Sequence, residues 1–162
     1  MKVFFWTLVI VMMLVIQSTI VPLLAIQGIT PDLLLIVVVS ASLLFGKDHG
    51  VGTGFFSGLL QDLASGNIFG VNTLSKLSTG YLFGMAERQV FKEHILLPIL
   101  AVAVATLFSG LIALLMMLIL GYKIQLFAAL INRVLPAVLY NMVFSIPIHK
   151  GIYSLSKKFN KA

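Results

Sequence analysis

Long apolar runs dominate the sequence, and they limit what the chain can fold into. A helix that crosses a bilayer needs about 20 mainly apolar residues, and runs of roughly this kind cover 3–24, 29–45 and 95–120. The 162 residues include only 11 Lys and Arg and 5 Asp and Glu, and 60% are hydrophobic. That is too few polar side chains for the surface of a water-soluble domain. The sequence therefore predicts an all-α integral membrane protein, with one polytopic domain over 1–162.

Two shorter helices are expected between the second and third of these runs. Polar turns interrupt the chain there, at 46–50, 65–70 and 87–94. The segments between the turns, 51–65 and 70–86, are only moderately apolar, so hydropathy alone does not establish them as spans.

The two ends of the chain leave alternatives open. The N-terminal run has no small-residue cleavage site, which favours an uncleaved first helix over a signal peptide. The last apolar segment, 126–148, is interrupted by polar residues and a proline. It is either one long helix or an interfacial helix to Ile131 followed by a shorter span from Val134.

Basic residues favour six spans, because loops that carry Lys and Arg tend to stay in the cytoplasm. With six spans, only Lys123 falls outside, and the residues on the inner side are Lys2, Lys47, Arg88, Lys92, Lys150, Lys157, Lys158 and Lys161. A single crossing between 51 and 86 would instead separate Lys47 from Lys92. We therefore expect both termini in the cytoplasm, with short outer loops at 25–30, 65–70 and 121–125.

Small residues follow a helical repeat in the two weaker segments. One row, at a spacing of four, is Gly50, Gly54, Gly58, Asp62 and Gly66, and the next segment carries Asn72, Lys76, Gly80 and Gly84. Such rows let membrane helices approach closely, since in lipid the association of helices depends on packing. We expect the two segments to form a buried hairpin.

Asp62 and Lys76 are the charges expected inside this hairpin. From a rise of about 1.5 Å per residue, they lie roughly 6 Å and 9 Å below the turn at 65–70. An isolated charge at membrane depth costs several kcal/mol, so we expect the two to pair. The pair either only holds the hairpin together or lines a functional site.

These residues resemble the family of the rod shape-determining protein MreD. The resemblance rests on TPDLLLIVVVSASLLFG at 30–46, on GVGTGFFSGLLQDLASGNIFGVNTLSKLSTGYLFG at 50–84 and on LPAVLYNMVFSIP at 135–147. We assign family-motif or structural roles to Gly54, Phe55, Gly58, Asp62, Gly66, Gly70, Lys76, Gly80, Tyr81, Gly84 and Asn141.

The resemblance implies six transmembrane helices arranged like the substrate-binding subunit of energy-coupling-factor transporters. It also implies a scaffold in the bacterial cytoplasmic membrane that acts in cell elongation and side-wall peptidoglycan synthesis, without a cofactor. The partners it implies are MreC, directly, and MreB and peptidoglycan synthases. Membrane lipids and a second copy of the chain are further expected contacts.

The shared fold makes a vitamin-binding transporter subunit the alternative function. Two features count against it. The expected outer loops are too short to close over a solute, and the first helix has no pair of small residues spaced by four for docking on a transporter.

Catalysis and nucleic-acid binding are not expected. The chain has no cysteine, and His49, His94 and His149 lack the spacing of a metal-binding helix. No nucleophile, base and orienting group come together in a known pattern. The net charge of +6 follows from the basic inner loops and tail, which suit anionic lipid.

Two local features have structural explanations. TPD at 30–32 fits the start of a helix, with Thr30 as N-cap, Pro31 in the first helical position and Asp32 near the positive end of the helix dipole. Arg133 is expected to reach the outer interface with its long side chain.

Overall fold

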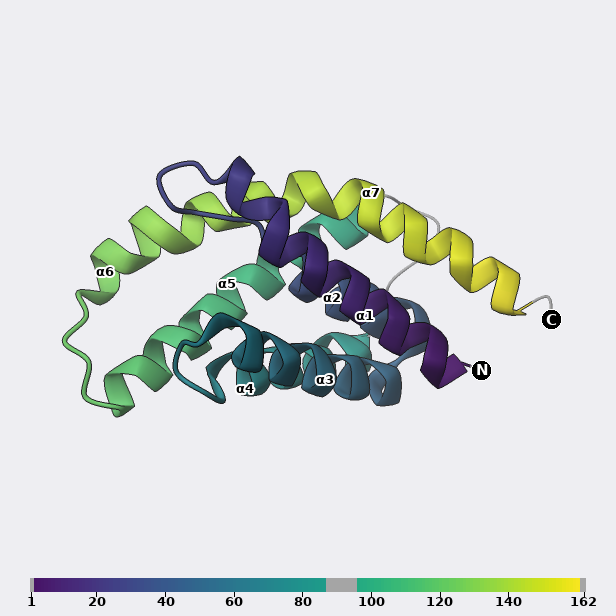
Figure 1. The fold of residues 1–162 in the computed structure, drawn as a ribbon, viewed down its shortest axis with the longest axis horizontal. Coiled ribbons are helices and arrows are strands. Elements are labelled where there is room, and N and C mark those ends of the chain that lie inside the picture. The colour runs from purple at the N-terminus through teal and green to yellow at the C-terminus, as the bar shows by residue number, and fades with distance from the viewer. Residues whose placement is uncertain (1, 87–95, 161–162) are drawn as a thin grey trace.

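The computed structural model describes residues 2–86 and 96–160, and these parts are helical without a β-strand. The predicted all-α class is confirmed. Outside the described residues lie the expected inner-side residues Arg88, Lys92, His94 and Lys161, and the first residue of the run 95–120. In chain order the elements are α1 (Lys2–Thr19), η1 (Val21–Leu24), α2 (Leu33–Phe45), α3 (Lys47–Ser65), α4 (Val71–Met85), α5 (Leu96–Ile119), α6 (Leu126–Ala129), η3 (Leu130–Val134) and α7 (Leu135–Asn160) (Figure 1).

The centre of the bundle is α2. It contacts α1, α3, α4, α5 and α7, and every residue from Leu33 to Leu44 is buried. A helix that is hydrophobic on all sides is stable only when it is surrounded, and α2 fits that description. The main hydrophobic cluster forms where α2 meets α5, around Ile36, Val39 and Val102.

The beginning of α2 differs from the expectation by two residues. Asp32, not Thr30, is the N-cap, because its Oδ1 accepts a hydrogen bond from the Leu35 backbone N–H at 3.0 Å. Pro31 therefore precedes the cap instead of occupying the first helical position. The carboxylate satisfies a free N–H of the first turn directly, which is a stronger contact than the dipole effect expected of it.

In the structure the last apolar segment is one continuous helix from α6 through η3 to α7. Residues Leu130–Val134 are widened to a π-helix, and the Leu135 N–H donates to the Leu130 carbonyl. Pro136 explains the change. It has no N–H, and its ring crowds the carbonyl four residues earlier, so the backbone shifts to the wider register over one turn.

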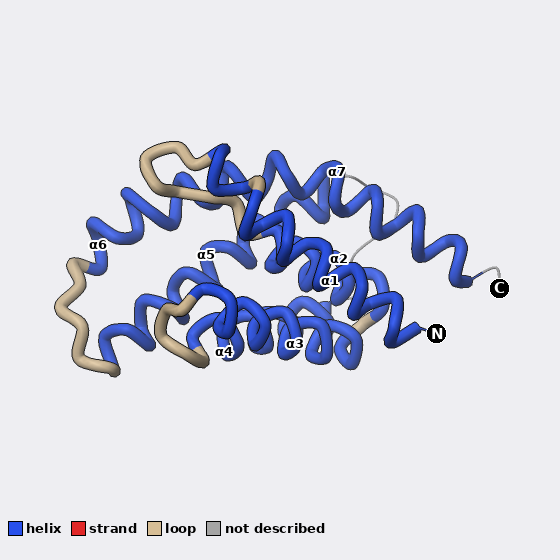
Figure 2. Tube along the Cα trace, in the orientation of Figure 1, coloured by secondary structure: helices blue, strands red, loops and turns tan. Residues whose placement is uncertain are grey.

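The termini of the described chain lie at one end of the bundle, and three loops lie at the other (Figures 1 and 2). These loops join η1 to α2, α3 to α4 and α5 to α6. Among the described helices, Leu96–Ile119 and Leu126–Leu155 are long and apolar enough to cross a membrane. Many large hydrophobic side chains on the outside of the bundle are exposed, Phe4, Leu23, Ile119 and Phe127 most of all.

Candidate functional site

The glycine rows bring α3 and α4 into close contact along most of their length. A methyl group added at Gly50, Gly54, Gly58, Gly80 or Gly84 would collide with backbone atoms of the facing segment. The facing groups are Gly50 and Gly80, Gly54 and Lys76, Gly58 with Asn72 and Thr73, and Gly84 with Gly46 and Lys47. The hairpin is thus held by backbone-to-backbone packing that only glycine permits.

The turn of the hairpin uses the other two glycines of the pattern. Gly66 ends α3 with φ at 62°, and Gly70 precedes α4 with φ at 97°. Both values are in the left-handed region, where glycine carries no steric penalty.

Asp62 binds the N-terminus of α4. Its Oδ2 accepts from the backbone N–H groups of Gly70 and Thr73 and from Thr73 Oγ1, and its Oδ1 accepts from the backbone N–H and Nδ2 of Asn72. The five bonds are between 2.6 and 3.1 Å long. A carboxylate at a helix N-terminus satisfies free N–H groups and faces the positive end of the dipole. The Asp62 carboxylate is therefore stabilised by uncharged donors, and no described residue forms an ion pair with it.

The predicted pairing of Asp62 with Lys76 is wrong, and the hairpin register gives the reason. Lys76 lies opposite Gly54, and Asp62 is about 12 Å farther along α3 at a rise of about 1.5 Å per residue. Depths counted separately on each helix missed this offset, because the end of α3 and the start of α4 do not lie at the same depth.

Lys76 forms its ion pair with Asp32, at the start of α2. Nζ is 2.6 Å from Asp32 Oδ2, Lys76 is fully buried, and the Asp32 side chain is 25% exposed. Because Oδ1 caps α2 at the same time, one carboxylate both completes a helix end and neutralises an ammonium from another helix. No spacing in the sequence would have revealed this pair, since 44 positions separate the two residues.

Asn141 extends this contact to α7 and α5. Its Oδ1 accepts from the Asp32 backbone N–H at 2.8 Å, and its Nδ2 donates to Thr106 Oγ1 at 2.9 Å. Gln17 of α1 joins from the other side, where its Oε1 accepts from the Leu34 N–H at 3.0 Å. Five helices thus meet through Asp32, Lys76, Asn141, Thr106 and Gln17, which we call the polar network.

A second contact joins α4 to α5 next to the polar network, where Ser75 and Ser109 hydroxyls lie 2.7 Å apart. Thr106, Ser75 and Ser109 were not predicted. Their signal was faint but present: Thr106 and Ser109 are three residues apart on an otherwise apolar helix, and hence on one face.

Phe55 and Tyr81 of the family pattern are not part of the polar network. Phe55 packs against Phe56 with ring centroids 5.5 Å apart, and Tyr81 lies under Lys47 Nζ, 5.2 Å from the ring centroid. Both side chains are exposed, so they are suited to contact lipid or another protein.

The described histidines do not meet. His49 stacks near Phe45 with a centroid separation of 5.6 Å, and His149 Nδ1 is 3.1 Å from Ser40 Oγ. Within 2–86 and 96–160, no three His, Cys, Asp or Glu side chains are grouped as metal ligands.

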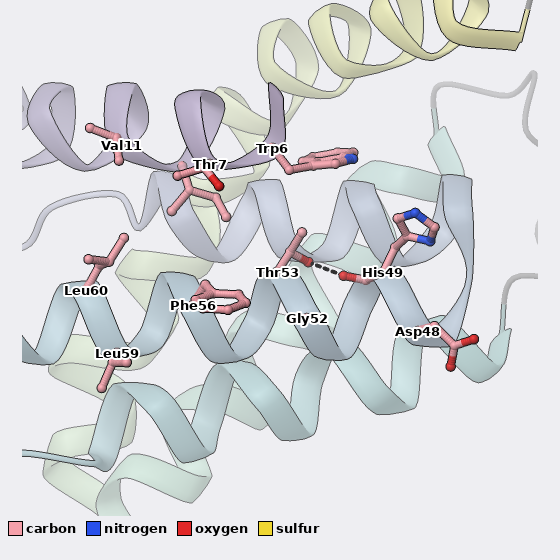
Figure 3. Close-up of a pocket in the computed structure, with 11 residues that line it drawn as sticks. Trp6, Thr7, Val11, Asp48, His49, Gly52, Thr53, Phe56, Leu59 and Leu60 are labelled. Atoms are coloured by element: carbon pink, nitrogen blue, oxygen red, sulfur yellow. Dashed lines mark hydrogen bonds between the residues drawn. The ribbon is translucent and has the colours of Figure 1, made fainter. Parts of the chain in front are cut away.

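A groove of about 490 Å³ lies between α1 and α3 (Figure 3). Its floor includes Gly52, around which no atom lies within 4 Å of the missing Cβ position. Asp48 and His49 lie toward one end and Leu59 and Leu60 toward the other. The lining from α1 is Trp6, Thr7, Ile10 and Val11, and from α3 it also includes Thr53 and Phe56.

The polar network and the groove between α1 and α3 differ in what they can bind. In the polar network each charged group is bonded to a neighbour, so the geometry serves to orient helices. The groove is mainly apolar with small residues in its floor, so it can receive an apolar chain or the side of a helix.

In a comparison with protein families, residues 1–159 match the model of the family described as rod shape-determining protein MreD. No curated protein matches the chain, and no solved structure matches it. The match covers nearly the whole sequence, so the resemblance found in the glycine-rich hairpin is confirmed.

Proposed function

Because the chain belongs to the MreD family, we propose that it is a membrane scaffold of the bacterial cell-elongation machinery, which supports side-wall peptidoglycan synthesis. The observation that carries the proposal is the family match over residues 1–159. A role in determining rod shape follows from the family itself. The family is a structural one, which supports a role without catalysis.

The proposed setting is the cytoplasmic membrane, crossed six times with both termini inside. Both ends of the described chain lie at one end of the bundle, which supports an even number of crossings (Figure 1). Lys47, Lys150 and Lys157 belong to the proposed inner side, and Lys123 to the outer loop between α5 and α6. The exposed apolar residues on the outside of the bundle support contact with lipid.

The proposed direct partner is MreC, through which the scaffold is linked to MreB and the synthases. We place the membrane helix of MreC in the groove between α1 and α3. Gly52 and Thr53 in the floor support this choice, because small residues allow another helix to approach closely.

A vitamin-binding subunit is less well supported. The polar groups at the centre of the described bundle bond to one another, as in the contacts of Asp32 with Lys76 and of Asn141 with Thr106. A solute would have to break these bonds to use them. The family match independently favours the scaffold.

Depletion of the protein tests the function. We expect rod-shaped cells to round or widen, and a plasmid copy to restore the shape, with no change in the uptake of any vitamin. A normal shape after depletion, together with growth restored by an added vitamin, would contradict the scaffold proposal.

Gly52→Leu tests the groove. The leucine side chain would fill open space in the groove, so the variant should accumulate normally. Several-fold less MreC should co-purify with it than with the unmodified protein. Gly151→Leu on α7 is the matched control, because Gly151 also has open space at its Cβ position. Equal MreC recovery by the two variants would remove the groove from the proposal without affecting the scaffold function.

A further inference from the structure

A polar pocket of about 620 Å³ lies at the loop end of the bundle, and its lining residues are neither in the groove nor in the polar network. It is formed by two segments far apart in the sequence, the loop before α2 and the π-helical turn η3. The lining residues are Gln27, Gly28, Ile29, Ile131, Asn132, Arg133 and Pro136. Arg133 is the charged residue among them, and none of these described residues is a carboxylate.

The two walls are fixed relative to each other. Tyr140 of α7 donates to the Leu24 carbonyl at 3.1 Å, before the loop, and Asn141 accepts from the Asp32 N–H, after it. The loop is thus attached to α7 at both ends, next to the π-helical turn that presents Asn132 and Arg133.

The loop itself turns tightly between Ile26 and Ile29, whose backbones exchange two hydrogen bonds of 3.2 and 3.0 Å. Gln27 and Gly28 at its tip both have positive φ, at 52° and 78°. A non-glycine residue in this conformation is uncommon. Successive N–H groups in such turns form concavities that bind anions.

The side-chain donors of this pocket have no acceptor elsewhere in the described chain. The side chains of Gln27, Asn132 and Arg133 make no hydrogen bond or ion pair with another residue of 2–86 or 96–160. The exposed guanidinium of Arg133 and the side-chain amides of Gln27 and Asn132 line the same pocket, and none of its described lining residues supplies a counter-charge. This donor set fits a tetrahedral oxyanion, which arginine can bind through two parallel hydrogen bonds.

We propose that this pocket binds a phosphate group carried by a membrane lipid. The position of the pocket at the loop end, beside exposed apolar residues such as Leu23, Ile26 and Phe127, places the lipid tails against the bundle and the phosphate between the two walls. The ligand class is a lipid phosphate monoester or diester.

Binding is tested with purified protein in an uncharged maltoside detergent, by native mass spectrometry and by thermal unfolding. The three probes are dioctanoyl phosphatidylglycerol, dioctanoylglycerol with the same tails but no phosphate, and inorganic phosphate. We expect only the first to bind and stabilise the protein. Arg133→Gln should raise the half-saturating concentration of dioctanoyl phosphatidylglycerol about tenfold, as for loss of a charge-assisted contact.

Lys123→Gln is the matched control, since it removes one exposed positive charge at the same end of the bundle but outside the pocket. It should change the half-saturating concentration by less than about twofold, because an exposed charge in salt is screened. Gln27→Gly should weaken binding about threefold without loss of folded protein, since glycine suits the positive φ.

Three results would overturn the proposal. Equal weakening by Lys123→Gln and Arg133→Gln would mean non-specific surface charge. Equal binding of dioctanoylglycerol would mean that the tails alone are recognised. Stabilisation by inorganic phosphate at the same concentrations as the lipid would mean that a soluble phosphate, not a lipid, is the ligand.

Discussion

Asp32 and Asp62 are two buried or half-buried carboxylates that the same fold stabilises in opposite ways. Asp62 is held by five hydrogen bonds from uncharged donors, all at the start of the helix that follows it. Asp32 is paired with one cation, Lys76, which reaches it from a helix far along the chain. The stabilisation of Asp62 is local and is spread over five bonds, which we call the distributed set. The stabilisation of Asp32 depends on one cation from a distant part of the chain, and we call Asp32 and Lys76 the concentrated pair.

The two carboxylates differ in when their partners come together. The hairpin could form and satisfy Asp62 before any other helix packs, because its donors lie within 11 positions. The contact of Asp32 with Lys76 requires α2 and α4 to be packed already. Removing one group should therefore be costly for the concentrated pair and mild for the distributed set.

Breaking the concentrated pair should have the largest effect. Asp32→Asn keeps an N-cap oxygen for α2 but leaves the fully buried Lys76 ammonium without its counter-charge. We expect a loss of about 3–5 kcal/mol in the free energy of unfolding, as for other buried pairs that lose one partner. Unfolding by a denaturing detergent, monitored by circular dichroism, measures this loss.

The reciprocal change should cost less, which makes the pair asymmetric. Lys76→Met leaves a carboxylate that is 25% exposed and still bonded to the Leu35 N–H, so about 1–3 kcal/mol is expected. The double variant should be more stable than Asp32→Asn alone. A double variant that loses the full sum of the two single effects would show that the two groups are not coupled.

Asp62→Asn should have an intermediate effect. An asparagine retains one acceptor oxygen, so at least two of the five donors lose their partner. Because these bonds are only part-buried and the donors can turn to water, we expect a total loss of about 1–3 kcal/mol in the free energy of unfolding. Combination with Lys76→Met should be additive within about 0.5 kcal/mol, as for groups that share no partner. If Lys76→Met instead recovered the stability lost in Asp62→Asn, that result would support a pairing of Asp62 with Lys76, which the structure contradicts.

The features that sequence alone predicted are those set by local periodicity. Spacing by four identified the rows through Gly54 and Gly80, because a helix fixes which residues share a face. The same rows carried the family resemblance. Length and composition gave the helical class, since few arrangements satisfy the backbone of so apolar a chain.

The features that sequence could not supply depend on register and on long-range packing. The offset between Asp62 and Lys76 depends on how many residues the turn at Gly66 and Gly70 takes up, which spacing within each helix does not show. Asn141 was a candidate without a partner, because its bond to Thr106 crosses between α7 and α5. The polar pocket is lined by residues of the π-helical turn. The cause of this turn, Pro136, is visible in the sequence, but the side of the helix on which it presents its residues is not.

The smallest effect should come from removing one member of the distributed set. Thr73→Val keeps the shape of the side chain and deletes the hydroxyl that donates to Asp62 Oδ2 at 2.6 Å, leaving four of the five bonds. Thr79→Val is the matched control on the same helix, since its hydroxyl donates only to the Ser75 carbonyl among the described residues. We expect Thr73→Val to cost about 0.5–1.5 kcal/mol and to couple with Asp62→Asn in a double-mutant cycle, while Thr79→Val adds independently. If Thr73→Val were instead as damaging as Asp32→Asn, the five bonds would act as one all-or-none unit, and the contrast between a distributed and a concentrated carboxylate would not hold.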